Sequence, residues 1–196
     1  MQYSRSLLCF LFISICAIGA YAQDVQRAPE TSYDVVLQIL IGGDDKANMP
    51  LPQNLGTIAK QLKANYPYAD YKLANTYVGR IGTNGNLEYK SISNVFGQTQ
   101  QTETPTFWEW SISTLRSPQT GNNLLMNGFR FGAKVPVRTG TTKDGSGSVQ
   151  PIFSYENIGI TAMRLIVVEN SPTLNGSLAL PNSTGTAFLV LTLRPA

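Results

Sequence analysis

The sequence VVLQILI, at residues 35–41, contains a single polar residue, Gln38, and is followed by the glycine pair Gly42 and Gly43. The run is short, almost entirely apolar and rich in β-branched side chains. A run of this length and composition is typical of a strand that is buried on both faces. We therefore expect a buried strand at the start of the fold.

One segment of the chain, residues 54–66, has the periodicity of an amphipathic helix. Its apolar residues recur on one face, and they are Leu55, Ile58, Ala59, Leu62 and Tyr66. Pro52 precedes the first turn, where its missing N–H costs little, and Pro67 ends the segment. A single helix with one apolar face needs a sheet to cover, so we expect it to pack on one.

Beyond Pro67 the apolar residues recur at every second position, which predicts strands. We expect these strands at residues 71–81, 87–92, 107–116, 128–138, 158–168, 173–180 and 186–193. Asn84 and Gly85 predict a hairpin turn between the first two strands. Pro136 predicts that residues 129–138 lie at a sheet edge, and the Gly-, Ser- and Thr-rich residues 139–150 are expected to form a flexible loop.

These patterns together predict an α+β, β-rich fold. One helix packed on a sheet is followed by an antiparallel β-sandwich or meander. Residues 33–196 are expected to form a single β-rich domain. The polar residues 97–105 have no apolar anchor, so a division into two subdomains at this place is the alternative.

Residues 1–22 have the pattern of a secretory signal peptide. Arg5 is followed by an apolar run at residues 7–18 and by Ala20 and Ala22, the small residues that precede a cleavage site. We therefore expect export, a mature chain that begins at Gln23, and a flexible leader at residues 23–32. A retained membrane anchor is the alternative, although the run is shorter than the roughly 20 residues of a spanning helix. No later segment of the sequence reaches that length.

The composition restricts where the protein works and what it binds. Cys9 and Cys16 are the only cysteines, and both fall in the predicted signal peptide. A mature chain without disulfides favours a bacterial periplasmic or extracellular protein. Without Arg5, 14 Lys and Arg residues (15 less one) face 12 Asp and Glu residues, with no run of like charges. Nucleic-acid binding through a basic stripe is therefore disfavoured.

The side chains that most often carry catalysis are missing from the predicted mature chain. It has no His and no Cys, and no Gly-x-Ser-x-Gly, Ser-x-x-Lys or phosphate-loop motif. We expect no enzyme activity, no cofactor and no metal. One alternative is a histidine-free hydrolase with a carboxylate pair drawn from Glu88, Glu103, Glu109 and Glu156. Another is a calcium loop at Gly43-Asp44-Asp45, which lacks the usual distal acid.

The candidate binding residues are aromatic, and they are Trp108, Trp110, Tyr66 and Tyr68. Exposed rings can stack on sugars or anchor a protein partner. The period-two spacing of Trp108 and Trp110 instead favours a core stripe on one face of a strand. Tyr66 and Tyr68 flank Pro67, where we expect them to hold the helix against the sheet rather than bind a ligand.

The order of elements in residues 33–93 resembles the small αβ modules of the secretin N-terminal region. The match consists of the strand at 35–41, the helix at 55–66, the strand at 71–81 and the hairpin to the strand at 87–92. The chain departs from the pattern because no second helix follows residue 92 and no pore-forming barrel region is present. The resemblance implies an interaction fold of the kind that stacks into rings and contacts partner proteins, and it does not imply a channel.

We accordingly predict an exported, non-catalytic envelope protein. It would act through protein–protein contacts, with an envelope protein or with a second copy of itself, or as a structural component. The alternatives are a carbohydrate-binding module that uses exposed aromatic side chains and the histidine-free hydrolase.

Overall fold

A computed structural model describes residues 31–44, 50–93, 104–116, 121–181 and 185–196 of the chain. The chain divides into two units, Met1–Glu30 and Thr31–Ala196, and the described residues all belong to the second. The predicted signal peptide and nearly all of the predicted leader lie outside the described residues.

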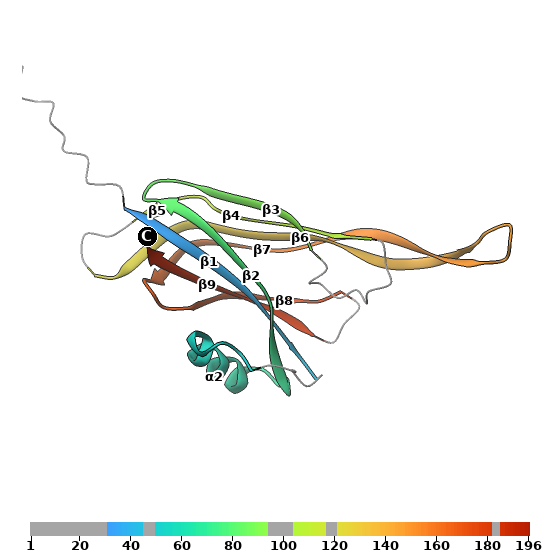
Figure 1. Ribbon diagram of the computed structural model, residues 1–196, viewed down its shortest axis with the longest axis horizontal. Helices are drawn as coiled ribbons and strands as arrows, with labels where there is room; N and C mark the ends of the chain where they lie inside the picture. The colour runs from blue at the N-terminus through green and yellow to red at the C-terminus, as the bar shows by residue number, and fades with distance from the viewer. Residues whose placement is uncertain (1–30, 45–49, 94–103, 117–120, 182–184) are drawn as a thin grey trace, which may run out of the picture. The chain divides into compact units, whose positions relative to one another are not determined.

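The described chain folds into two antiparallel sheets and one helix (Figure 1). Sheet A contains β2 (Asp70–Gly82), β1 (Ser32–Gly43), β9 (Thr186–Pro195) and β8 (Thr173–Ala179), in this spatial order. In sheet B, β3 (Leu87–Ser93) pairs with β4 (Thr106–Ile112), which pairs with β6 (Asn123–Lys143). The strands β5 (Leu115–Arg116) and β7 (Val149–Val168) also pair with β6. The predicted β-rich α+β sandwich is thus confirmed.

The main core lies between the inner faces of the two sheets. Sheet A contributes alternate residues of its two central strands, and sheet B contributes large aromatic side chains of β4 and β6. These buried residues include Val35, Leu37, Ile39, Leu189, Leu191, Trp108, Trp110, Phe129 and Phe131. Burying each large apolar side chain stabilises the fold by about 1.5–3 kcal/mol. The sequence VVLQILI lies in β1 and is apolar on both sides. Its odd-numbered residues face this core, and Leu40 packs on the opposite face of sheet A.

The helix α2 (Gly56–Asn65) covers the outer face of sheet A, as the sequence predicts. It follows the short 3-10 helix η2 (Gln53–Leu55), and its apolar face packs on Leu40, Phe188 and Val190. The backbone turns extended at Tyr66, just before Pro67, because the residue before a proline avoids the helical region. The Tyr71 hydroxyl donates a hydrogen bond to the Leu62 carbonyl over 3.0 Å and fastens the helix to β2.

The predicted hairpin between residues 71–81 and 87–92 is wrong. The turn itself forms, with Asn84 at φ 64° and the Gly85 N–H donating to the Gly82 carbonyl over 3.0 Å. However, β2 pairs with β1 in sheet A, whereas β3 pairs with β4 in sheet B. Both strands bury apolar side chains in the core between the sheets, and Leu87 lies directly over Gly79. The chain therefore crosses from one sheet to the other at this turn.

The predicted flexible loop at residues 139–150 is also wrong. Strand β6 continues to Lys143 and β7 begins at Val149, because Thr and Val suit an extended backbone and the two strands continue to pair beyond a register shift between Arg138 and Gly140. The connection is a tight turn in which the Asp144 carboxylate accepts hydrogen bonds from the N–H groups of Ser146 (3.0 Å) and Ser148 (2.8 Å). Figure 1 shows the hairpin running on beyond the ends of β3 and β4.

The prediction of a sheet edge at residues 129–138 needs a correction. Residues 129–134 of β6 pair with β4 on one side and with β7 on the other, so this part is central in sheet B. From Val135 onward, the described strand pairs of β6 involve β7 alone, and Pro136 lies in this part. The proline signal identifies the place where the pairing of β6 with β4 stops, beside the first residues of β4, because a proline cannot donate to a second ladder. The predicted strand 107–116 is divided into β4 and β5.

Candidate functional site

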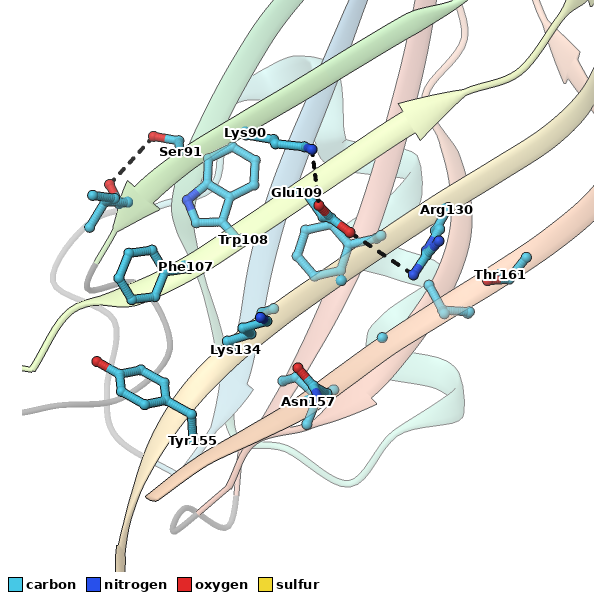
Figure 2. Close-up of a pocket in the computed structure, with 17 residues that line it drawn as sticks. Lys90, Ser91, Phe107, Trp108, Glu109, Arg130, Lys134, Tyr155, Asn157 and Thr161 are labelled. Atoms are coloured by element: carbon cyan, nitrogen blue, oxygen red, sulfur yellow. Dashed lines mark hydrogen bonds and ion pairs between the residues drawn. The ribbon is translucent and has the colours of Figure 1, made fainter. Parts of the chain in front are cut away.

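A groove of about 1130 Å³ lies on the face of sheet B that points away from the core (Figure 2). Four strands line it, β3, β4, β6 and β7. The strand register arranges the outward side chains in three rows across the sheet. The first row is Ile92, Phe107, Lys134 and Asn157, the second is Lys90, Glu109, Gly132 and Gly159, and the third is Glu88, Ser111, Arg130 and Thr161.

Two glycines create the depth of the groove. Gly132 and Gly159 stand opposite each other in the second row, so the floor there is bare backbone between two rows of side chains. A Cβ at Gly132 would meet its nearest atom, Glu109 Cγ, at 3.8 Å. A Cβ at Gly159 would lie 2.6 Å from the Phe131 carbonyl oxygen, a distance at which the backbone must move. Only glycine therefore fits at position 159 without a shift.

One end of the groove is charged. The Glu109 carboxylate lies between two cations, with Lys90 Nζ 3.8 Å from Oε2 and Arg130 Nη2 4.0 Å from Oε1 (Figure 2). Lys90 Nζ also lies 2.9 Å from Glu88 Oε1. The hydrogen bond and the charge of Glu88, with a smaller contribution from Glu109, raise the pKa of Lys90, so its ammonium stays protonated. These pairs are solvent-exposed, so each stabilises the fold little.

The other end of the groove is apolar and aromatic. Phe107 and Tyr155 are 41% and 44% exposed, and their ring centroids lie 5.8 Å apart at 53°. The Tyr155 hydroxyl donates a hydrogen bond to the Pro105 carbonyl over 3.0 Å, which fixes the ring at the groove wall. Ile92, 62% exposed, precedes Phe107 in the first row. In Figure 2 the Lys134 side chain lies between this aromatic pair and the Glu109–Arg130 pair.

Of the four sequence-predicted binding residues, Trp108 alone is among the described residues that line the groove. Trp108 and Trp110 are 2% and 1% exposed and stack with Tyr89 in the core, at centroid distances of 5.4 and 6.0 Å. Neither indole therefore has a face open to a sugar ring. Tyr66 and Tyr68 are half-buried and pack edge-on against Phe188 under the helix.

Of the groove residues, sequence reasoning named Trp108 as a candidate ring and Glu109 as a candidate carboxylate, and it missed the residues of β7. The alternation that turns Trp108 and Trp110 inward turns Phe107 and Glu109 outward, and this signal was present in the sequence. The contribution of β7 was hidden, because Tyr155, Asn157 and Gly159 reach the groove only through their pairing with β6.

The candidate catalytic carboxylates do not form a pair at the groove. Glu109 lines it between two cations, and Glu88 lies one row away, paired with Lys90. Glu156 is an exposed residue of β7, and Glu103 lies outside the described residues. Within the described part of the chain, no group of three or more acidic residues is placed to hold a metal ion, Asp44 included. Its helices are also too short or too polar to cross a membrane.

The chain is thus an antiparallel two-sheet sandwich with one covering helix and an open groove on one outer face. Neither a protein-family model nor a curated protein matches it. Among solved structures, it is similar to the secretin-domain β-barrel of InvG from the Salmonella SPI-1 injectisome. The identity is 10% and the TM-score 0.41, over 97% of this chain and 68% of that one.

Two further structures are of the same Salmonella secretin, each 10% identical over 97% of this chain with a TM-score of 0.26. One is the type III secretion injectisome secretin InvG, of which 69% is covered. The other is the basal body of InvG, PrgH and PrgK, of which 49% is covered. All three structures contain the secretin InvG, and the likeness to each is weak. Residues 33–93 themselves do not form a separate sheet, because β9 pairs with β1 and β3 belongs to sheet B.

Proposed function

We propose that this chain is an exported, non-catalytic protein of the bacterial envelope that works through protein–protein contacts. The contact surface is the groove on sheet B. The observation that carries the proposal is the lining of the groove, which combines exposed aromatic and aliphatic side chains with cations. Aromatic residues and Arg are enriched where proteins bind one another. The export signal predicted at residues 1–22 supports the location.

Binding suits this groove better than catalysis does. A glycosidase needs two carboxylates across the scissile bond, roughly 5–9 Å apart, one of which keeps a proton. Glu109 is the only carboxylate among the described lining residues, so a second carboxylate to form such a pair is missing there. The histidine-free hydrolase is therefore the weaker hypothesis. Turnover of a glycoside or ester by the purified protein, lost in Glu109→Gln, would revive it.

Affinity capture from the organism's own envelope extract tests the proposal. Three baits are compared: the natural chain, Tyr155→Ala in the groove, and Val78→Ala as a control on the outer face of sheet A, where Val78 is exposed. We expect the same protein in the natural and control captures and a marked loss with Tyr155→Ala. Equal recovery by all three baits would contradict a contact at the groove.

A carbohydrate-binding role retains one observation in its favour, the exposed rings of Phe107 and Tyr155. Their planes are inclined at 53°, so they do not form one flat platform for a sugar. Binding of a neutral glycan on an array, abolished by Tyr155→Ala, would favour this role over protein contact.

A further inference from the structure

We propose that the groove binds an extended acidic segment of a partner protein. A carboxylate of the segment pairs with Lys134, and a neighbouring apolar side chain packs on Ile92, Phe107 and Tyr155. This inference rests on the proposed function, since it names the kind of partner that the same groove accepts.

The charge of the groove points to an acidic partner. Three cations line it, Lys90, Arg130 and Lys134, against the single carboxylate of Glu109. Lys90 and Arg130 already share that carboxylate, at 3.8 and 4.0 Å, and Lys90 also pairs with Glu88 at 2.9 Å. Lys134 forms no ion pair with any described residue. Its neighbours in the row, Phe107 and Asn157, are uncharged. An exposed ammonium beside an aromatic wall is therefore the position at which a partner carboxylate gains most.

The shape of the groove suits an extended chain. Successive rows on a strand face lie about 7 Å apart, which is the repeat of same-side residues in an extended peptide. A side chain that enters over Gly132 and Gly159 is flanked by Lys134 and Arg130, one row away on either side. The next same-side residue of the ligand then reaches the first row, where Phe107 and Ile92 lie. An acidic residue and an apolar residue two positions apart would match this order.

An acidic polysaccharide offers the same charge but not the same apolar surface. Ile92 is exposed and aliphatic, and the rings of Phe107 and Tyr155 are inclined to each other. Sugars bind aliphatic side chains poorly and favour flat aromatic faces. The groove therefore fits a peptide better than a glycan.

Selection of phage-displayed random dodecapeptides on the purified protein tests the inference. The natural chain is compared with Lys134→Glu, which reverses the charge, and with Lys72→Glu, an equal charge change at an exposed position of β2 in sheet A. Thermal unfolding establishes that both variants are folded. We expect the natural chain and Lys72→Glu to enrich peptides rich in Asp or Glu beside apolar residues. These peptides should bind Lys134→Glu at least about ten-fold more weakly than they bind the natural chain. Their binding to the natural chain should also weaken as the salt concentration rises.

Three results would overturn the inference. The first is a set of enriched peptides without acidic residues. The second is equal binding of the acidic peptides to Lys134→Glu and to the natural chain. The third is binding of polygalacturonate, lost in Lys134→Glu, with no peptide enriched, which would assign the groove to an acidic polysaccharide. If envelope capture still depends on Tyr155 while the peptide selection fails, the proposed function stands and the acidic segment does not. If both fail, the groove is not a contact surface.

Discussion

The two glycines in the groove floor provide a matched pair of substitutions with opposite expected outcomes. Gly159→Ala places a methyl group 2.6 Å from the Phe131 carbonyl oxygen and 3.3 Å from Gly132 Cα, and both are backbone atoms that a rotamer change cannot move. The paired strands β6 and β7 must shift to accept it. Overpacking of this kind costs about 1–3 kcal/mol.

Gly132→Ala is the control on the facing strand. Its methyl group meets nothing closer than 3.8 Å, and an alanine loses less backbone entropy on folding than a glycine does. We expect the free energy of unfolding to be unchanged or raised by up to about 1 kcal/mol. The two variants should thus differ by roughly 2 kcal/mol, or about 4–8 °C in melting temperature for a domain of this size.

Urea unfolding followed by circular dichroism measures this difference directly. Equal midpoints for Gly159→Ala and Gly132→Ala would refute the close approach of β7 to β6 at this pair. A lower midpoint for Gly132→Ala than for Gly159→Ala would refute it more strongly. The register of the groove rows would then need revision.

Three further predictions concern the core, the helix and the hairpin. Trp108 and Trp110, the only tryptophans of the chain, should give a blue-shifted emission that acrylamide quenches weakly, and a red-shifted, readily quenched signal would contradict their burial. Tyr71→Phe should cost about 1 kcal/mol at neutral pH, because the hydrogen bond to the Leu62 carbonyl is lost. Burial, more than the neighbouring tyrosines, raises the pKa of the Tyr71 hydroxyl in the folded state. The hydroxyl therefore contributes its full stabilisation below the unfolded-state pKa near 10, and this stabilisation is lost as the pH rises through the folded-state pKa. The stability gap between the natural chain and Tyr71→Phe should therefore narrow in strong alkali, and a constant gap would contradict this account. Asp144→Ala should speed hydrogen exchange at Ser146 and Ser148, whose N–H groups lose their acceptor, and unchanged exchange would show that the carboxylate does not hold the turn.

The elements of the fold could largely be predicted from local sequence, and their partners could not. Residues 35–41 specify a buried strand, and the spacing from Leu55 to Tyr66 specifies one helical face, because these patterns depend on nearby residues. The same reasoning failed at Asn84 and Gly85, where the turn forms but the strands enter different sheets. The pairing of β1 with β9 joins residues at the two ends of the domain, and no local pattern encodes it.

The candidate site was hidden for a related reason. The size of the tryptophans favours them as binding residues. Their alternation with Phe107 and Glu109, however, turns the indoles inward and leaves the Phe107 ring exposed. Residues 139–150 contain few apolar side chains, so the length of the β6–β7 hairpin did not appear in the pattern. The groove exists only after three strand pairings bring its rows together, which is tertiary information.

Photo-crosslinking in the living cell tests the central claim most directly. The full chain carries p-benzoylphenylalanine at Tyr155, an aromatic position on the groove wall, or at Val78, a more exposed position on the outer face of sheet A. If the groove is the contact surface, irradiation gives a discrete higher-mass adduct with a protein from position 155 and none from position 78. An adduct from position 78 alone, or no protein adduct from position 155 in a folded and exported chain, would contradict it.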